Sequence, residues 1–286
     1  MSSDVQGVDN MGNCESILYD DWSVDERRCF FAYLHGIDSK DAVMPTDFDR
    51  LVKIVNDTIE RSAEMNGSMM MFRTDKGAWV AALNSDVRIR IVSDSIYLWT
   101  KSCEWPTEFD SLLHLVSSML VAGFEYALPL RGVVGYGKLT FDGGEILDDM
   151  STGVLHVDPA PHGSQLSEAR ELSSQIDLSC VVLSPNVGIG LRREFAGGRI
   201  ECTATINCPR DIIKHSRYLI EHLVQIGDNR ENCIVVNWNY DTSRELPQNI
   251  IQEAFDELNP VFGTNAGFIR GETLRFYDET RNRKYK

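Results

Sequence analysis

Alternation of hydrophobic and polar positions is clearest in residues 86–100, which run DVRIRIVSDSIYLWT. In VRIRIV every second residue is apolar, the period of a β-strand with one buried face. The polar SDS interrupts the apolar positions before IYLW resumes them, so the pattern predicts two strands joined at a tip that carries Asp94. Because Ser and Asp are ordinary turn residues, two interpretations of Asp94 are open: a turn residue, or a carboxylate that binds a metal ion.

Apolar residues recur at helical spacing in two segments. The first predicted helix begins at Pro45 and ends at Asn66, and the second begins at Pro106 and ends before Pro129. Their apolar stripes are Phe48, Leu51, Val52, Val55 and Ile59 in the first, and Phe109, Leu112, Leu113, Val116, Leu120 and Phe124 in the second. Each stripe predicts a helix that packs one face on a core.

The remaining elements follow from shorter patterns. We expect strands at residues 29–34, 130–141, 178–183 and 233–238, a hairpin at 69–72 and 78–83, a loop or flap at 142–161, and helices at 163–175, about 209–226 and 247–258. Strands and helices are mixed without strict βαβ alternation, which favours the α+β class. We expect a mobile lead-in at residues 1–25, a main domain at 26–196, and a C-terminal α/β extension at 197–286 that packs on it.

Composition narrows the possible partners. The chain has 286 residues, 43% of them hydrophobic and 25% charged, which is typical of a soluble globular protein. A net charge of −15 argues against binding to nucleic acid, which needs a basic surface, but local cations can still hold a nucleoside triphosphate. Seven cysteines without a C-x-x-C pair, no apolar signal region and no long apolar window predict a cytoplasmic protein with reduced thiols and no membrane insertion.

Four segments carry a family resemblance. They are FFAYLHGIDSK at residues 30–40, VSDSI at 92–96, LRGVVGYG at 130–137 and GSQLSEARELS at 163–173. In this order they resemble the class III nucleotidyl cyclases, and most closely the pyrimidine nucleotide cyclases of bacterial Pycsar anti-phage systems. Those proteins typically have FFAYLDILGTK, SDS or SDT, LRGGIAIG and GPALVEAYELE. The resemblance spans residues 29–184, a little over half of the chain.

The resemblance implies a ferredoxin-like core covered by helices, and a homodimer with active sites between the protomers. The implied reaction converts UTP or CTP, with UTP favoured, into the 3′,5′-cyclic nucleotide and pyrophosphate. The cyclic product would act on a separate effector as an antiviral second messenger. The alternative is a catalytically silent homologue that binds a nucleotide or a protein and regulates it.

Site residues are carried over by the same resemblance. Asp94 would bind metal, Gly36 would help to hold a second metal through its carbonyl, Tyr33 would line the nucleotide, and Arg131 would be the catalytic cation that faces the phosphate. Two Mn²⁺ or Mg²⁺ ions would activate the ribose 3′-oxygen and neutralise the leaving group. The planar guanidinium of Arg131 suits a phosphate. Taken alone, Arg131 could equally form a structural salt bridge at the start of its strand.

The first metal position departs from the family. His35 stands where the first metal-binding aspartate is expected, and Asp38 stands where the family usually has glycine. A neutral imidazole can bind Mn²⁺, but it cannot bridge two hard cations as a carboxylate does. Three outcomes are open: an active enzyme with a His-modified site, an enzyme with one tightly held metal, or an inactive homologue. His35 could also be a turn residue at the end of a strand.

Polar residues in two other predicted helices are ambiguous. Adenylyl and guanylyl cyclases have Asn and Arg where this chain has Ser167 and Glu171. The glutamate agrees with the pyrimidine pattern, yet Ser167, Arg170 and Glu171 fit an exposed helix face equally well. His215 and His222 lie seven residues apart and would share a helix face, which we interpret as structural because no third ligand is nearby.

Overall fold

A computed structural model gives the structure of the protein. It describes residues 26–37, 45–66, 69–73, 79–83, 87–100, 107–141, 147–149, 154–156, 161–187, 218–239, 246–262 and 264–283. The predicted lead-in at 1–25, Asp38 and His215 lie outside the described residues. The expected domain boundary near residue 196 also lies outside them and stays a prediction.

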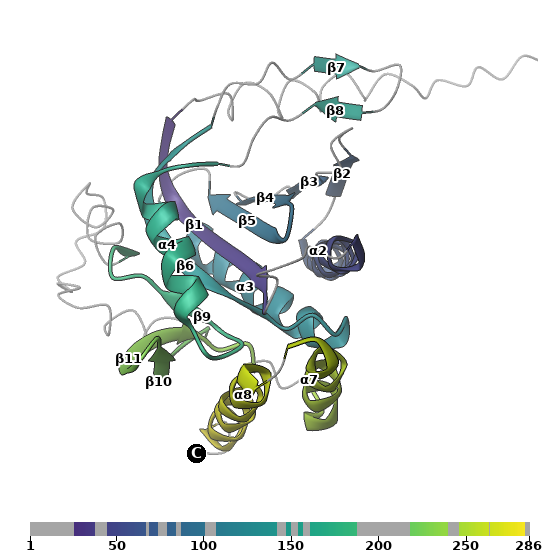
Figure 1. Ribbon diagram of the computed structural model, residues 1–286. Helices are drawn as coiled ribbons and strands as arrows, with labels where there is room; N and C mark the ends of the chain where they lie inside the picture. The colour runs from purple at the N-terminus through teal and green to yellow at the C-terminus, as the bar shows by residue number, and fades with distance from the viewer. Residues whose placement is uncertain are drawn as a thin grey trace, which may run out of the picture.

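One mixed sheet contains all of the strands in the described part of the chain. They are β1 (Glu26–Gly36), β2 (Met69–Arg73), β3 (Trp79–Leu83), β4 (Val87–Val92), β5 (Ser95–Thr100), β6 (Leu130–Thr140), β7 (Leu147–Asp149), β8 (Val154–His156), β9 (Val181–Leu183), β10 (Leu219–Ile226) and β11 (Asn229–Val236). Their order is β10-β11-β9-β6-β1-β5-β4-β3-β2-β8-β7 (Figure 1). The β6–β9 and β2–β8 pairs are parallel and the others are antiparallel.

Helices cover both faces of the middle of this sheet. They are α2 (Pro45–Asn66), α3 (Thr107–Glu125), α4 (Ser164–Gln175), α7 (Gln248–Phe262) and α8 (Thr264–Arg283). The helix α3 packs on β1, β4, β5 and β6 and against α2, whereas α4 packs on β6 and β1 from the other side (Figure 1). The α7 helix contacts both α3 and α8. This arrangement confirms the α+β class.

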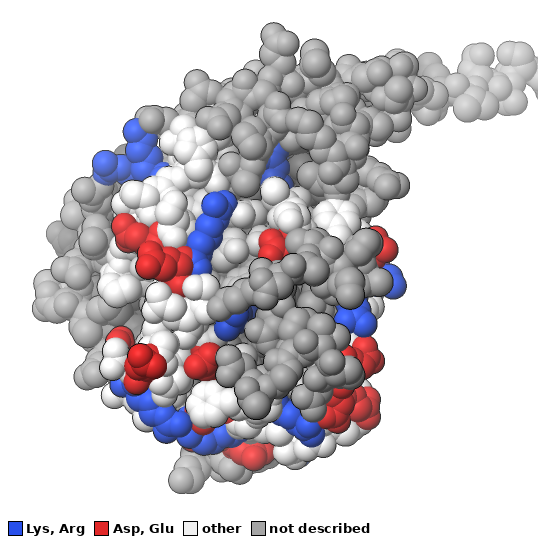
Figure 2. Space-filling view, in the orientation of Figure 1, with Lys and Arg blue, Asp and Glu red and all other residues white. Residues whose placement is uncertain are grey.

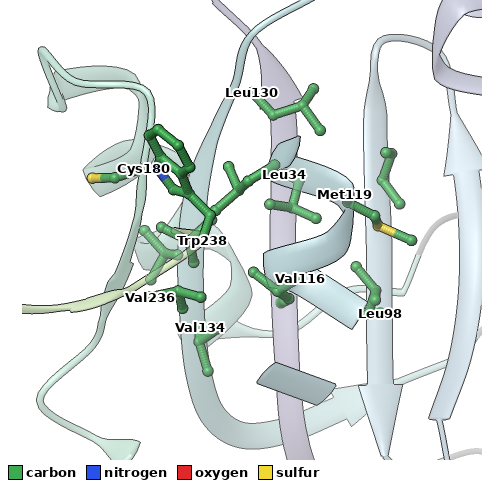
Figure 3. Close-up of a cluster of buried hydrophobic side chains, with 14 of the residues drawn as sticks. Leu34, Leu98, Val116, Met119, Leu130, Val134, Cys180, Val236 and Trp238 are labelled. Atoms are coloured by element: carbon green, nitrogen blue, oxygen red, sulfur yellow. The ribbon is translucent and has the colours of Figure 1, made fainter. Parts of the chain in front are cut away.

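The core lies between the sheet and α3. The predicted stripe of α3 is buried, with Phe109, Val116 and Leu120 fully inaccessible to solvent. Figure 3 shows Val116 and Met119 of α3 facing Leu34 of β1 and Leu98 of β5. Burial of such apolar side chains is the main favourable contribution to folding. The helical periodicity of the sequence therefore predicted the buried face of α3 correctly.

The C-terminal region corrects one prediction. Residues 219–226, expected to end a helix, form the strand β10, which pairs with β11. Gly227 has φ 56°, a left-handed conformation that suits glycine and allows a tight hairpin. His222 is therefore a strand residue, and the expected shared helix face with His215 is wrong.

Three smaller differences concern the extent of elements. The loop expected at 142–161 contains the short strands β7 and β8, which pair with each other. The strand expected at 178–183 forms only from Val181. The helix α8 was not expected at all, because its apolar residues are few and spread around its circumference. None of the helices in the described part of the chain is long and apolar enough to cross a membrane.

Candidate functional site

Three adjacent strands bring the predicted site residues onto one face of the sheet. Tyr33 of β1 pairs with Tyr97 of β5, and His35 pairs with Ser95 of β5 and Arg131 of β6. Side chains of a strand alternate between the two faces. These five residues therefore share the face covered by α4, opposite the face that packs on α3.

Asp94 sits at the predicted hairpin tip, between the end of β4 and the start of β5. The preceding residue, Ser93, has φ 56°, which places the turn in the left-handed region. The Ser95 hydroxyl donates a hydrogen bond of 2.9 Å to Oδ1 of Asp94. The Tyr33 hydroxyl lies 3.0 Å from the same serine oxygen. Asp94 is therefore a turn residue whose carboxylate is linked through Ser95 to Tyr33 of β1.

His35 is enclosed rather than placed in a turn. Its side chain lies within β1 and is 7% exposed, and its ring stacks on Tyr33 with centroids 5.5 Å apart. Burial, together with the charge of Arg131, lowers the pKa of His35 to about 4, although Asp94 acts in the opposite direction. The imidazole is therefore neutral at pH 7, and its buried Nε2 has no hydrogen-bond partner.

Arg131 is buried, with 2% of the residue exposed. Its Nη1 donates a hydrogen bond of 2.7 Å to the carbonyl of Ile176, just after α4. The side chain thus links β6 to the end of α4, and its charge reaches His35 and Tyr33. Gly36 ends β1 opposite Leu130, and its backbone forms a hydrogen bond with His35.

Arg170 is a member of this cluster that the sequence interpretation missed. Its Nη2 donates a hydrogen bond of 2.8 Å to the Tyr97 hydroxyl. Its guanidinium carbon lies 5.2 Å from the centre of the Tyr97 ring and 5.8 Å from that of Tyr33, within the range of cation–π attraction. The signal was present in the sequence, because Arg170 lies four residues after Leu166, on the side of α4 that is buried.

The two other polar residues of α4 lie elsewhere. Ser167 and Glu171 are exposed, and the Ser167 hydroxyl donates back to the carbonyl of Gly163. The helix can approach β6 closely because Gly137 has no side chain: a Cβ there would lie 2.7 Å from Cβ of Gln165. This close contact brings Arg170 over the two tyrosine rings.

The residues of this cluster offer few metal ligands. Among the residues that the structure describes, no group of three or more His, Cys, Asp or Glu side chains could hold a metal ion. Asp94 and the neutral His35, with its unpartnered Nε2, provide one hard and one borderline ligand. Mg²⁺ is commonly bound by one or two carboxylates together with substrate phosphates. The donors therefore fit one divalent cation, with water or a substrate as its other ligands, better than they fit two.

Charge on the visible surface is mixed. Figure 2 shows basic and acidic side chains interspersed over the described residues of this face, without a continuous basic area. No protein-family model matches the chain, and a search of curated proteins found no significant match.

Proposed function

We propose that the cluster on the α4 face binds a nucleoside triphosphate and that the protein is a pyrimidine nucleotide cyclase. The observation that carries the proposal is the convergence of four residues chosen from sequence alone. Tyr33, His35, Asp94 and Arg131 come from three separate segments, yet the charges of Asp94 and Arg131 both act on the pKa of Tyr33 and on that of His35. Perturbed titratable groups that gather in this way are typical of functional sites.

Topology supports the same proposal. The elements β1, α2, β4, β5, α3 and β6 follow one another in a β-α-β-β-α-β sequence, interrupted by the β2–β3 hairpin. Their strands lie in the order β6-β1-β5-β4. That is the ferredoxin-like arrangement, which the resemblance to class III cyclases implies. Glu171 of α4, where adenylyl and guanylyl cyclases have Arg, favours the pyrimidine branch. The histidine at the first metal position departs from that branch as well and favours a modified or silent site.

Electrostatics favour an anionic ligand. Arg131 and Arg170 bring two guanidinium groups to the same face, and Arg90, which pairs with Tyr97, is buried on that face as well. Asp94 is the acidic residue whose charge acts on Tyr33, His35 and Tyr97. Guanidinium groups bind phosphate oxygens in a bidentate manner, so these arginines support a triphosphate ligand in a chain of net charge −15.

In the proposed reaction the ribose 3′-oxygen forms a bond to the α-phosphorus. The bond between that phosphorus and the bridging oxygen breaks, pyrophosphate leaves, and the hydroxyl proton is lost. Asp94 and His35 would hold a divalent cation, Mn²⁺ or Mg²⁺, which would acidify the hydroxyl and neutralise the phosphates. Tyr33 would line the nucleotide, and Arg131 would stabilise charge that develops on the α-phosphate. A homodimer and a separate effector for the product belong to the same proposal.

Product analysis tests the proposal. The purified protein is incubated separately with ATP, GTP, CTP and UTP in the presence of Mn²⁺, and cyclic nucleotides are identified by mass spectrometry. We expect cyclic UMP or cyclic CMP. Asp94→Asn should reduce the rate by at least about 100-fold, since a metal-binding carboxylate is lost. Glu231→Gln, which neutralises an exposed carboxylate on β11, serves as the matched control and should leave the rate unchanged.

The same experiment addresses the second candidate function, a catalytically silent regulator. The small number of metal ligands among the described residues favours this candidate. A chain that binds a nucleotide but forms no cyclic product from any of the four triphosphates supports the silent homologue and overturns the cyclase. If product does form, His35→Ala should abolish it. Full activity in that variant would show that His35 is not at the first metal position.

A further inference from the structure

We propose that Tyr33 and Ser95 are positioning residues that hold the Asp94 carboxylate in one orientation for a divalent cation. The inference rests on the proposed function, because it assigns a cation to Asp94. It differs from the expectation for Tyr33, whose hydroxyl is directed here to a serine instead of to a nucleotide.

Hydrogen-bond chemistry gives the chain a direction. The Ser95 hydroxyl has one proton, and it donates that proton to Oδ1 of Asp94 at 2.9 Å. The Tyr33 hydroxyl, 3.0 Å from the serine oxygen, must therefore be the donor in the second bond. A tyrosine hydroxyl carries its proton at neutral pH, so it can serve as that donor. The order is Tyr33 to Ser95 to Asp94.

The hydrogen bond from Ser95 restricts the orientation of the Asp94 carboxylate. An ionised carboxylate has about four lone-pair sites, and the bond from Ser95 occupies one of them. A hydroxyl bond to a carboxylate is charge-assisted and stronger than a neutral bond. The bond from Ser95 therefore restricts the rotation of the Asp94 side chain, which lies in the turn between β4 and β5. Partners behind a metal ligand commonly act in this way.

The donor at the start of the chain is itself fixed. The His35 ring stacks on Tyr33 at 5.5 Å and 29°, and the Tyr97 ring lies 5.4 Å away at 56°. Arg170 holds the second tyrosine by its hydrogen bond to the hydroxyl and lies over both rings. Tyr33 is therefore surrounded on several sides, and its hydroxyl has little freedom to leave Ser95.

Two substitutions separate positioning from packing. Tyr33→Phe removes the hydroxyl and keeps the ring, and Ser95→Ala breaks both bonds of the chain. We expect each to weaken the binding of Mn²⁺ alone by about 10- to 100-fold, as loss of a supporting partner does at metal sites. The double variant should bind Mn²⁺ no more weakly than Ser95→Ala, because Tyr33 acts only through the serine.

Binding of Mn²⁺ to the full-length protein is measured by electron paramagnetic resonance, with thermal unfolding as the check on folding. Tyr218→Phe is the matched control: it removes a hydroxyl that lies 3.4 Å from His114 of α3, away from Asp94, and should leave the affinity unchanged. Tyr33→Phe keeps the test decisive if Ser95→Ala does not fold, since the aromatic ring is retained.

The outcomes distinguish the inference from the proposed function. If Asp94→Asn abolishes Mn²⁺ binding while Tyr33→Phe and Ser95→Ala bind as the wild type does, the positioning chain is wrong and the metal site stands. If the wild type binds no Mn²⁺, the metal site itself is wrong, and the inference falls with it. An additive loss in the double variant would mean that Tyr33 acts on the site independently of Ser95.

Discussion

The two faces of β1 are both buried, yet they differ in chemistry. Leu34 and its neighbour Leu98 pack on α3 and are at most 1% exposed. One residue earlier and one later along the same strand, Tyr33 and His35 face α4, together with Arg131. Burial of polar groups is costly unless they are hydrogen-bonded, so a face of this kind adds less to stability than an aliphatic one. The comparison teaches that burial alone does not distinguish a core from a site.

Retaining costly polar groups on one face requires a reason other than stability. On the α4 face the polar groups are connected: Tyr33 to Ser95, Ser95 to Asp94, Arg170 to Tyr97 and Arg131 to Ile176. His35 remains with an unpartnered Nε2. Arg170 Nε and Ser173 Oγ of α4 are also buried without a hydrogen-bond partner. Unsatisfied polar atoms of this kind are consistent with the ligand that we propose for this face.

Neighbouring residues on the two faces provide the sharpest test. Leu34→Ala should lower the free energy of unfolding by about 2–5 kcal/mol, because it creates a cavity against α3. Tyr33→Phe should cost only about 0.5–1.5 kcal/mol, since it removes one hydrogen bond. Urea unfolding followed by circular dichroism measures both. Equal losses in the two variants would contradict the division into a core face and a site face.

Acid should affect the site face specifically. The pKa of His35 is about 4 in the folded protein and 6.5 as its ordinary value. The unfolded chain therefore binds a proton that the folded chain does not, and stability is lost as the pH falls from about 6.5 towards about 4. Asp94, Arg131, the Tyr33 ring and the backbone of Ser173 surround the imidazole.

The measurement compares the wild type with His35→Gln, both freed of metal with a chelator. Between about pH 7 and about pH 5 the wild type should lose about 2 kcal/mol more than the variant, which has no imidazole to protonate. Other titrating groups contribute equally to the two proteins and cancel in the difference. Identical pH profiles would show that His35 is not held neutral by its surroundings.

Much of the core face could be predicted from the sequence. The helical stripe of α3 and the alternation in β4 both report which side chains face a common core, and both predictions are confirmed. The strand β10 could not be found in this way. Its segment LIEHLVQI has apolar residues at helical as well as strand spacing, and the hairpin with β11, formed through Gly227, decides between the two.

The site face was only partly predictable. Tyr33, His35 and Asp94 were found because four segments resemble a family in the same order along the chain. The spacing of hydrophobic residues alone does not identify them. Arg170 was missed because a helix pattern cannot say which side chain lies over an aromatic pair on a distant strand. Tyr97 was placed in a strand correctly, whereas Ser95, predicted in the tip, is the first residue of β5. The partners of both depend on the register between β1 and β5. Register arises from pairing of whole strands, so it is not visible in one segment.

The close approach of α4 to β6 can be broken at Gly137. An added Cβ would meet Cβ of Gln165 at 2.7 Å, and that atom is fixed to the helix backbone, so α4 must shift. Gly137→Ala should cost about 1–3 kcal/mol, as overpacking does. Gly271→Ala is the matched control: nothing lies within 4 Å of its added Cβ, and in the α8 helix alanine should stabilise by about 0.5–1 kcal/mol. The same sign for both changes would argue against a tight contact of α4 with the sheet.

The smallest effect expected is the coupling between Arg170 and Tyr97. A hydrogen bond to the hydroxyl and the cation over the ring should together give about 1 kcal/mol of interaction energy. Arg170→Met keeps much of the aliphatic length, and Tyr97→Phe keeps the ring, so the double-mutant cycle isolates the polar contacts. Because Tyr97→Phe retains the cation–π contact, the cycle reports mainly the hydrogen bond, and Tyr97→Leu in a second cycle adds the contribution of the ring. A coupling near zero in both cycles would mean that α4 is held by its apolar side alone. A coupling confined to the second would show that the guanidinium is held by the ring and leaves its hydrogen-bond donors to a ligand.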